Sequence, residues 1–466
     1  MRDLTYCAVM GRKNEIMKKA VGIDYSEFEF GKIGFDYEKM MSNVAYEMDD
    51  MINIQKETKV GNTPLFELHN INRLVKANSA DGKGGRIFIK DEAANASGSF
   101  KARRAAISVY HAQKMGYKGV IAATSGNYGA AVASQAAQRG LKCIIVQEVF
   151  DSQKKGQPEI VEKARKCEAF GAEVIQLTVG PELFYTFLKL LEETGFFNAS
   201  LYTPFGIAGV ETLGYEIAEQ MNSMEGRYPD YVVATHAGGG NLTGTARGLI
   251  KAGATGCKVY GASVDLKGLH MASDKDFNRK SFTTGHTGFG IPFATQPDRA
   301  DVPRNAARVL RYMDRYLTVT QGEVFYVTEM LAQIEGIERG PAGNVSLAAA
   351  ISLAMEVDEG KIIVVQETEY TGAGKHPMPQ LTFARENGIK IYRGEIRENV
   401  PGKTIVLPRQ FGQIKAVELD LKKMKERYVG NVTKGFKYEE LTEDDVKYLA
   451  DEVRIDRVEI EKIMNK

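Results

Sequence analysis

The sequence predicts an α/β fold in which mostly parallel sheets are covered by helices on both faces. Glycine is abundant, with 47 residues, and many glycines stand where a strand should pass into a helix. From about residue 105 to 205, helix and strand patterns alternate, and the strands are continuous apolar runs. Such runs indicate parallel strands that are buried on both faces, because half-exposed strands alternate in polarity instead.

Composition narrows the class of protein before any motif is considered. The 466 residues suit two or three domains, and 61 basic against 60 acidic residues give a net charge of +1. No global field therefore attracts nucleic acid or an anionic membrane. The four cysteines are far apart and match no metal spacing, which fits a reducing cytosol. No apolar signal segment or membrane span is found, so we expect a cytoplasmic protein.

The first 104 residues are expected to comprise a helical segment, two short strands and the start of a further helix. Residues 1–58 predict a helical N-terminal extension, since "EIMKKAVG" and "YEKMMSNVAYEMDDMINIQKE" carry apolar residues at helical spacing. "VGNTPLFEL" then predicts a turn and a short strand, and "RIFIKDE" predicts a second strand. The segment "NASGSFKARRA" leads into a helix that should end at Gly116.

Residues 105–205 predict a small α/β domain. "KGVIAATSGN" reads as strand and turn, "YGAAVASQAAQRG" as a helix closed by Gly140, and "LKCIIVQE" as the next strand. The segment "QPEIVEKARKCEAFGAEVIQL" repeats this order, with Gly171 between its helix and its strand.

A second sheet is expected from three later segments: "DYVVATHAGGGNLTGTARGLI", "CKVYGASVD" and "KIIVVQETEYTGAGK". We assign them to a large domain made of residues 59–104 and 206–395. Residues 396–466 are rich in charge and form an expected C-terminal extension. Within it, Thr442 with Asp445 three residues later predicts a capping box at a helix start.

Three glycine-containing turns each follow an expected strand and precede an expected helix. Open α/β folds bind ligands at this edge, where helix N-termini present free N–H groups. The first turn, "TSGNYG" at 124–129, offers hydroxyl and N–H groups that suit a carboxylate. Its serine, threonine and asparagine are also good helix caps, and taken alone this turn is better explained as a cap.

The second turn, "HAGGGNLTG" at 236–244, has three consecutive glycines whose amides can surround a phosphate, with donors from Asn241 and Thr243. It matches neither a Walker loop nor a G-x-G-x-x-G turn. A tight structural turn is the alternative, but three glycines cost chain entropy, which favours the phosphate. The third turn, "EYTGAGKHP" at 369–377, places the Thr371 hydroxyl at the sheet edge, and taken alone it is better explained as a cap.

Lys101 follows small and hydroxyl residues at a strand-to-helix turn. Together with a carboxylate cradle and a phosphate cradle, it fits pyridoxal phosphate chemistry, which needs an unprotonated lysine on a rigid support. Burial and the neighbouring Arg103 and Arg104 would lower its pKa, unless those arginines are solvated on the helix face. Lys90 is a competing lysine, but an ordinary salt bridge to the two acidic residues that follow it explains its presence.

Five motifs occur in order over roughly residues 58–385: "GNTPL", "SGSFKAR", "TSGNYG", "GGGNLTG" and "TGAGK". This set resembles the fold-type II pyridoxal phosphate enzymes, which include tryptophan synthase β, cysteine synthase, threonine synthase and threonine deaminase. The resemblance implies two open twisted sheets, with the cofactor held by the large domain in the cleft between the domains.

The resemblance also assigns roles to individual residues. Lys101 matches the lysine that forms a Schiff base with the cofactor, and Asn127 matches the asparagine that hydrogen-bonds the cofactor's ring hydroxyl. The loop matched to the substrate carboxylate comprises Thr124, Ser125 and Gly126. The loop matched to the cofactor phosphate comprises Ala237, Gly238, Gly239, Gly240 and Asn241.

The chain departs from the family pattern at three places. Thr371 matches the hydroxyl residue at the pyridine nitrogen, but the extra "ETEY" leaves Thr368 as a rival. Ala96 stands where proline is frequent, and Arg104 stands where glycine often follows the arginine. A hydroxyl does not keep the pyridine protonated as a carboxylate would, so the ring is expected to be a weaker electron sink.

The length, the segment "CAVMGRKNEIMKKAVGIDYSEFEF" and the charged tail resemble the β subunits of one branch of this family. That branch comprises thiolases of ornithine fermentation, which cleave 2-amino-4-oxopentanoate with coenzyme A to alanine (the D isomer) and acetyl-CoA. The resemblance implies pyridoxal 5'-phosphate as cofactor, coenzyme A as co-substrate, a small α subunit as partner and a homodimer of β subunits. It implies no metal and no nucleic acid or membrane partner.

Alternative functions stay open on sequence alone. A threonine synthase-like β-replacement or β-elimination lyase shares every cofactor motif. A nicotinamide oxidoreductase fits the α/β pattern but lacks the G-x-G-x-x-G turn, and a scaffold subunit would have no use for the lysine and three cradles. The sequence does not locate the coenzyme A site. A cysteine could carry the acetyl group, but Cys143 and Cys167 are expected to be buried and inert.

Overall fold

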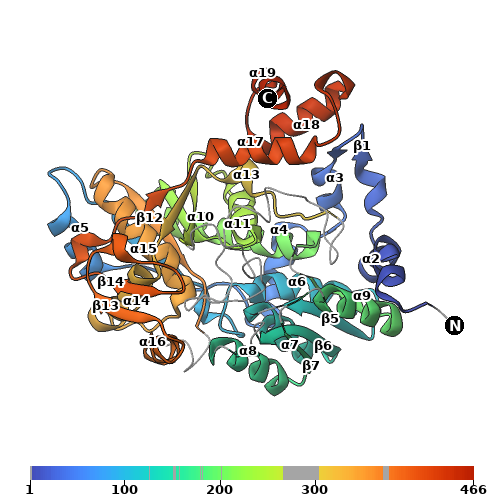
Figure 1. The fold of residues 1–466 in the computed structure, drawn as a ribbon, viewed down its shortest axis with the longest axis horizontal. Coiled ribbons are helices and arrows are strands. Elements are labelled where there is room, and N and C mark those ends of the chain that lie inside the picture. Colours follow the sequence, from blue (N-terminus) through green and yellow to red (C-terminus); the bar gives the residue numbers. More distant parts are fainter. Residues whose placement is uncertain are drawn as a thin grey trace.

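The computed structural model describes residues 3–124, 126–150, 154–156, 158–178, 180, 182–200, 202–265, 304–370 and 377–465. Two open sheets with helices on both faces form its centre, which confirms the predicted α/β class (Figure 1). Within this part of the chain, no helix combines the length and apolarity that crossing a membrane requires.

The larger sheet has seven strands. Their spatial order is β15 (Val417–Glu418), β11 (Arg315–Val319), β10 (Lys258–Val264), β9 (Tyr231–Thr235), β12 (Ile362–Glu367), β4 (Arg86–Asp91) and β3 (Leu65–Glu67). The inner strands are parallel, and only the edge strands β15 and β3 pair antiparallel. Because the inner strands run the same way, the turns that follow β9 and β12 lie at the same edge of the sheet.

Helices cover both faces of this sheet. Successive residues of β12 show the alternation: Ile362 and Val364 pack into one core cluster, while Ile363 and Val365 pack into another. The first face is covered by α10 (Pro204–Glu225) and α11 (Gly240–Lys251), and the second by α5 (His69–Asn78), α14 (Gln321–Met330) and α15 (Pro341–Glu356).

The smaller sheet has four parallel strands. Their order is β7 (Glu173–Thr178), β6 (Lys142–Phe150), β5 (Gly119–Thr124) and β8 (Phe197–Asn198). Its helices are α6 (Lys101–Lys114), α7 (Asn127–Arg139), α8 (Pro158–Ala169) and α9 (Glu182–Thr194). Val120 and Ala122 of β5 belong to the same cluster as the alanines of α7, whereas Ile121 and Ala123 pack with Phe187 of α9. The division into domains at residues 105 and 205 stays a prediction.

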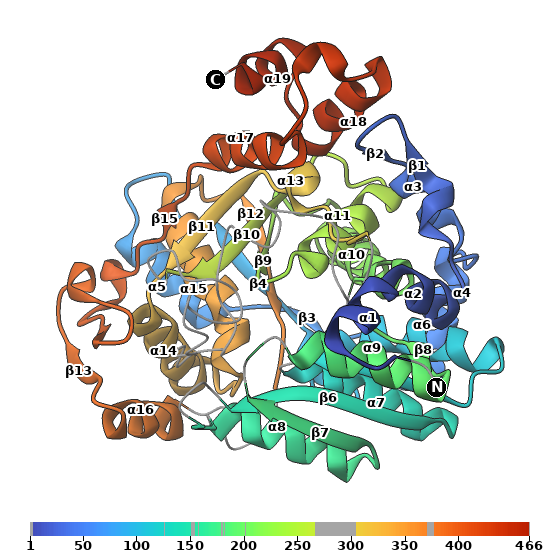
Figure 2. The ribbon, with the colours of Figure 1, turned by 45° about the vertical axis from the view of Figure 1, so that its right-hand side comes forward.

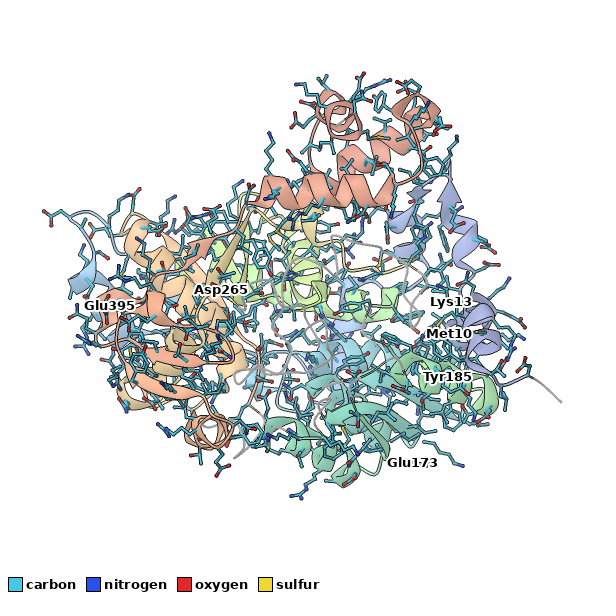
Figure 3. The ribbon with its side chains drawn as sticks, in the orientation of Figure 1. Met10, Lys13, Glu173, Tyr185, Asp265 and Glu395 are labelled. Carbon is cyan, nitrogen blue, oxygen red and sulfur yellow. The ribbon has the colours of Figure 1, made fainter. Side chains whose placement is uncertain are left out.

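The N-terminal region is helical apart from a short hairpin that was not expected. Its helices are α1 (Tyr6–Gly11), α2 (Lys13–Val21), α3 (Tyr37–Ser42) and α4 (Met48–Glu57), and its hairpin pairs β1 (Glu29–Phe30) with β2 (Gly34–Phe35). Met10, Lys13 and Tyr185 lie on one side of the molecule, where the N-terminal helices meet α9 (Figure 3). The Tyr185 hydroxyl donates to the Leu4 carbonyl at 2.7 Å.

The C-terminal region adds a small sheet and a helical layer. Its elements are α16 (Pro377–Glu386), β13 (Lys390–Arg393), β14 (Thr404–Leu407), α17 (Leu421–Val432), α18 (Glu443–Val453) and α19 (Arg457–Met464). The short helix α13 (Val309–Tyr312) lies beneath this layer, and α18 lies beside the N-terminal hairpin (Figure 2).

A single carboxylate joins the two ends of the chain. The capping box at α18 is confirmed, because Thr442 Oγ1 accepts from the Asp445 N–H and Asp445 Oδ2 accepts from the Thr442 N–H. Asp445 also accepts from the N–H groups of Lys32 at 2.9 Å, Ile33 at 3.0 Å and Gly34 at 3.2 Å. The first turn of α18 therefore fixes the loop of the hairpin.

Candidate active site

Lys101 is the first residue of α6, and its loop is held against the end of β12. The Phe100 N–H donates to the Thr368 carbonyl at 3.1 Å, and the Tyr370 N–H donates to the Gly98 carbonyl at 2.8 Å. Gly98 has a φ of +76°, and a Cβ there would overlap the Tyr370 carbonyl oxygen. A glycine is thus required before the lysine because another backbone segment approaches there. Lys101 and Thr368 are held on neighbouring segments as a result.

Arg103 is buried in a network of ion pairs, so the alternative that it is solvated on the helix face is wrong, while its effect on the pKa of Lys101 stays a prediction. Its guanidinium pairs with Glu92 at 2.7 Å and with Glu216 of α10, and it donates to Thr212 Oγ1 at 3.1 Å. Thr63, from the "GNTPL" motif, donates to Glu92 at 2.6 Å. Two carboxylates therefore balance the charge of Arg103, and the network fixes the start of α6.

Lys90 belongs to the same network, so its expected salt bridge to the acidic residues next to it is wrong. Its ammonium donates to the Thr63 carbonyl at 2.6 Å and to Gln220 Oε1 at 2.7 Å, and it lies 3.2 Å from Glu216. Asp91 pairs with Arg339 instead. Burial lowers the pKa of Lys90 to about 8 although the Glu216 carboxylate acts in the opposite direction. Its bonds assign Lys90 to the framework of the site.

The turn after β5 leaves the start of α7 without a side-chain cap. The cap position is Gly126, and Thr124 Oγ1 accepts from the Gly126 N–H at 3.0 Å. Asn127 begins the helix, and its Oδ1 is buried with no hydrogen-bond partner in the part of the chain described. The explanation of this turn as a helix cap is therefore not supported, and free backbone N–H groups are left for a ligand. Ser125 lies outside the described residues.

The glycine turn after β9 is shaped by the side chains that pack against it. Gly239 has a φ of +86° and precedes α11, whose start also has no side-chain cap. A Cβ on Gly238 would overlap the Tyr202 hydroxyl, and one on Gly240 would lie 2.7 Å from Nη2 of Arg104. These contacts leave no room for side chains, so the backbone between Ala237 and Gly240 is the surface that the loop presents.

Polar side chains around this turn lack partners among the residues that the structure describes. Nδ2 and Oδ1 of Asn241 are buried without a hydrogen bond, and so is the Thr243 hydroxyl. His236 is buried beside Tyr316, with ring centroids 5.1 Å apart, and burial lowers its pKa to about 3. The imidazole is therefore neutral near pH 7. The unbonded amide of Asn241 fits a phosphate ligand, because buried polar groups are nearly always bonded.

The turns that follow β5 and β9, and the segment just after β12, converge on the first turn of α6. Arg104, three residues after Lys101, reaches Gly240 at the start of α11, and its guanidinium lies 5.9 Å from the Tyr202 ring centroid. Its charge also acts on Tyr128, the second residue of α7. Thr368 follows β12 and holds the loop of Lys101, as described above. Thr371, matched to the pyridine nitrogen, lies outside the described residues.

Glu367, at the end of β12, is a buried acid that no sequence motif marks. Burial raises its pKa well above the usual value, and neither carboxyl oxygen has a hydrogen-bond partner in the described ranges. Its side chain contacts Gly343 in the first turn of α15, on the face of the sheet opposite α11. The alternation of strand residues thus directs Glu367 away from the phosphate turn.

Cys143 and Cys167 are buried, whereas Cys257 is partly buried and Cys7 is exposed. Burial raises the pKa of Cys143, and it raises that of Cys167 and Cys257 to about 12. A thiol with a raised pKa is a poor nucleophile, because the thiolate is the reactive form. The buried and inert state expected of Cys143 and Cys167 agrees with this environment.

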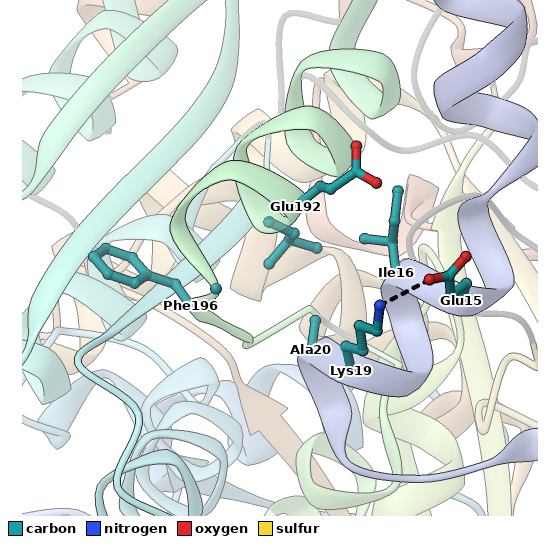
Figure 4. A pocket seen from close by; sticks show the side chains of 8 residues that line it. Glu15, Ile16, Lys19, Ala20, Glu192 and Phe196 are labelled. Carbon is teal, nitrogen blue, oxygen red and sulfur yellow. Dashed lines mark hydrogen bonds and ion pairs between the residues drawn. The ribbon is translucent and has the colours of Figure 1, made fainter. Parts of the chain in front are cut away.

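A small cavity between α2 and α9 lies apart from these turns (Figure 4). Its volume is about 90 Å³, and Lys19 on its wall is paired with Glu15 at 2.7 Å. Glu192, also on the wall, is paired with Arg12. None of the residues matched to a cofactor lines it. It is too small for a cofactor of drug-like size, which needs several hundred Å³ (roughly 300–1,000 Å³).

The residues at the convergence fit pyridoxal phosphate. This cofactor needs an amine, a contact to its ring and a contact to its phosphate. Lys101 at the start of α6 can supply the amine, the unbonded Asn127 at the start of α7 the ring contact, and the glycine turn before α11 the phosphate contact. The described residues contain no group of His, Cys, Asp and Glu arranged to hold a metal ion.

Comparison with known proteins gives consistent results. Residues 56–369 match the family model described as pyridoxal-phosphate dependent enzyme. The 2-amino-4-ketopentanoate thiolase beta subunit of Acetoanaerobium sticklandii is 65% identical over 455 residues, which cover 98% of this chain and 97% of that protein. The threonine synthase of a Bacillus species is 26% identical over 65% of this chain and 79% of its own length.

Solved structures show the same fold. A pyridoxal 5'-phosphate-dependent aspartate racemase superposes with a TM-score of 0.57 at 19% identity, over 71% of this chain and 97% of that one.

Proposed function

The chain belongs to the family of pyridoxal-phosphate-dependent enzymes, and we propose that it is the catalytic β subunit of a 2-amino-4-oxopentanoate thiolase. One observation carries the proposal. The 65% identity to the thiolase beta subunit extends over 98% of the chain, and so includes both terminal regions outside residues 56–369. A common cofactor site alone would not require those regions to be alike.

The proposed reaction converts 2-amino-4-oxopentanoate and coenzyme A into alanine, as the D isomer, and acetyl-CoA. The C3–C4 bond of the substrate breaks, and the thiol sulfur of coenzyme A forms the new bond to C4. The electron pair of the broken bond takes up a proton at C3, which becomes the methyl group of alanine. The thiol proton balances this gain, so no oxidant or reductant is needed.

Bound pyridoxal phosphate would supply an electron sink next to the substrate amino group. Lys101 would hold the cofactor and move the proton at Cα. Asn127 would bind the ring hydroxyl, and Thr371, or its rival Thr368, the pyridine nitrogen. The loop of Ala237, Gly238, Gly239, Gly240 and Asn241 would bind the phosphate. The loop of Thr124, Ser125 and Gly126 would bind the substrate carboxylate.

We further propose a hetero-oligomer with a small α subunit, in which two β subunits form a homodimer. The name of the relative, a beta subunit, supports the first part. The cysteines in the structure are unpaired, which supports the cytoplasm as location.

The test uses the purified chain together with its partner subunit. We expect a visible absorption band from lysine-bound pyridoxal that changes on addition of 2-amino-4-oxopentanoate, and acetyl-CoA and alanine in equal amounts once coenzyme A is added. Lys101→Ala should remove the band and the turnover. Lys114→Ala, at the other end of the same helix, is the matched control and should keep both.

Two results would contradict the proposal. Absence of the band from the wild-type protein would remove the cofactor from the site. Release of phosphate or ammonia from a small amino acid, without any acetyl-CoA from the proposed substrate, would identify the β-replacement or β-elimination lyase instead.

A further inference from the structure

Arg104 is a buried cation without a counter-charge in the described structure. It is 3% exposed, and its guanidinium lies 5.0 Å from the ring centroid of Phe100. It forms no hydrogen bond or ion pair with any residue described, and its Nε is buried without a partner. Since residues three apart share a helix face, Arg104 is on the same side of α6 as Lys101.

The other buried arginines among the described residues are paired. Arg103 has Glu92 at 2.7 Å, and Arg308 has Glu452 at 2.6 Å. Burial lowers the pKa of Arg104, and the titratable side chains that act on it among the described residues are Tyr202 and Tyr128, which are neutral near pH 7. Burying a cation is unfavourable unless an anion or several acceptors compensate it. Arg104 therefore lacks an anion that each of the other two obtains from a side chain.

The position of the guanidinium indicates where that anion binds. Nη2 and Cζ of Arg104 lie 2.7 Å and 3.1 Å from the place a Cβ would take on Gly240, the first residue of α11. The start of α11 has no side-chain cap, and the amide of Asn241 has no partner in this part of the chain. A cation, free N–H groups and an unbonded amide thus meet at one point, and all three favour an anion.

We propose that Arg104 binds the 5'-phosphate of the cofactor, and so adds a cation to a phosphate site otherwise made of backbone amides. The planar guanidinium suits the oxygen atoms of a phosphate, to which it can donate two parallel hydrogen bonds. The inference rests on the proposed placement of the phosphate at Ala237–Asn241, and not on the thiolase reaction. A phosphate contact also explains why this chain has an arginine at position 104, where related enzymes often have a glycine.

The test compares ligands with and without the phosphate. Apoprotein of wild type and of Arg104→Met is titrated with pyridoxal phosphate and with pyridoxal, and binding is followed by visible absorbance. We expect Arg104→Met to bind pyridoxal phosphate roughly 10- to 100-fold more weakly, as for one lost charge-assisted hydrogen bond. Pyridoxal affinity should change less than about twofold, because pyridoxal has no phosphate for the arginine to bind.

Thermal unfolding of the apoproteins supplies a readout independent of activity. Arg104→Met should melt at or above the wild-type temperature, because an uncompensated buried charge has been removed. Arg103→Met is the matched control and should melt lower, because it leaves Glu92 and Glu216 without their partner. If Arg104→Met does not fold, Arg104→Lys is used instead, and the phosphorus NMR shift of its bound cofactor is compared with that of the wild type. A shift equal to the wild-type value overturns the proposal.

Failure of the proposed function and failure of the inference about Arg104 give different results. Wild-type protein that binds no pyridoxal phosphate defeats the proposed function and this inference together. Wild type and Arg104→Met with equal affinity for pyridoxal phosphate defeat this inference alone. A raised KM for the amino acid at unchanged cofactor affinity would assign Arg104 to the substrate carboxylate, and also overturns it.

Discussion

Arg103 and Arg104 are consecutive residues of one helix, yet their charges are balanced differently. Arg103 faces Glu92 and Glu216, while Arg104 faces two aromatic rings and the start of α11. The sequence predicts that both lie beside Lys101, but not which groups they meet. Glu216 is 113 residues from Arg103 along the chain, and no local pattern encodes such a contact. The presence of two arginines beside Lys101 was therefore predictable from the sequence, but the groups that each arginine contacts were not.

Neutralising Glu92 should destabilise the protein strongly. Glu92→Gln removes one of the two carboxylates of a fully buried arginine, and breaking such a pair costs about 3–5 kcal/mol in the free energy of unfolding. Urea unfolding of the apoprotein measures it. Glu359→Gln is the control, because its pair with Lys76 is exposed and should change stability by less than about 0.5 kcal/mol. Equal stability of the two variants would contradict the role of the network.

Single substitutions can show which of the two threonines after β12, Thr368 or Thr371, bonds the pyridine nitrogen. If Thr371 bonds the pyridine nitrogen, Thr371→Val should lower turnover roughly 2- to 10-fold, as expected for one neutral hydrogen bond, and shift the visible spectrum. Thr368→Val should leave both nearly unchanged, because the contact seen for Thr368 is made by its carbonyl. The opposite pattern in stopped-flow spectra and rates would assign the nitrogen to Thr368.

At the scale of elements, the turns that precede α6, α7 and α11 follow from the sequence because glycine and small residues mark them. Each of these helices starts without a side-chain cap. Short elements with weaker patterns were missed: β11, and the pair β13 and β14, are four or five residues long. The exposed residues of β13 lack an apolar run, so only its pairing with β14 identifies it as a strand.

The contact between α18 and the N-terminal hairpin predicts a pH-dependent stability. Burial alone would raise the pKa of Asp445, but backbone N–H donors, those of Ile33 and Thr442 foremost, outweigh it and hold the pKa below 3.8. A depressed pKa stabilises the fold above the unfolded-state pKa, and this stabilisation is lost as the pH falls through the folded-state pKa.

Asp445→Asn should therefore reduce the free energy of unfolding by about 1.5–3 kcal/mol at neutral pH, because hydrogen bonds to a charged acceptor are lost. The difference from wild type should shrink below about pH 4, where Asp445 begins to be protonated in the unfolded chain. Asp444→Asn removes the same charge from the same helix turn at an exposed position, and serves as the control. A difference that persists unchanged at low pH would contradict this account.

At the scale of the whole molecule, the α/β class and both sheets were predicted because their inner strands are continuous apolar runs. Val364 and Val365 of β12, for example, are both fully buried on opposite faces. The packing of the last three helices was not predictable, because their apolar faces do not specify a partner. In the structure these helices share a core with residues near the N-terminus, among them Tyr37.

Removing residues 421–466 should therefore affect the whole molecule. The truncation takes away Glu452, the closest ion-pair partner of Arg308, and uncovers the apolar core that these helices share with Tyr37. We expect a lower melting temperature and cofactor release on mild heating, measured by circular dichroism and visible absorbance. Glu452→Gln should reproduce the ion-pair part of the loss, and a truncated chain as stable as the full one would contradict the shared core.

The clamp at Asp445 also sets an order of events during synthesis. Lys32 and Asp445 are 413 residues apart, so at 5–20 residues per second a ribosome needs about 20–80 s to make the second after the first. For that time the three N–H groups of the hairpin loop have no acceptor from α18, and the apolar surface around Tyr37 has no cover. The N-terminal region of each new chain thus completes its fold only after Asp445 has been made, and until then it exposes apolar surface that chaperones bind.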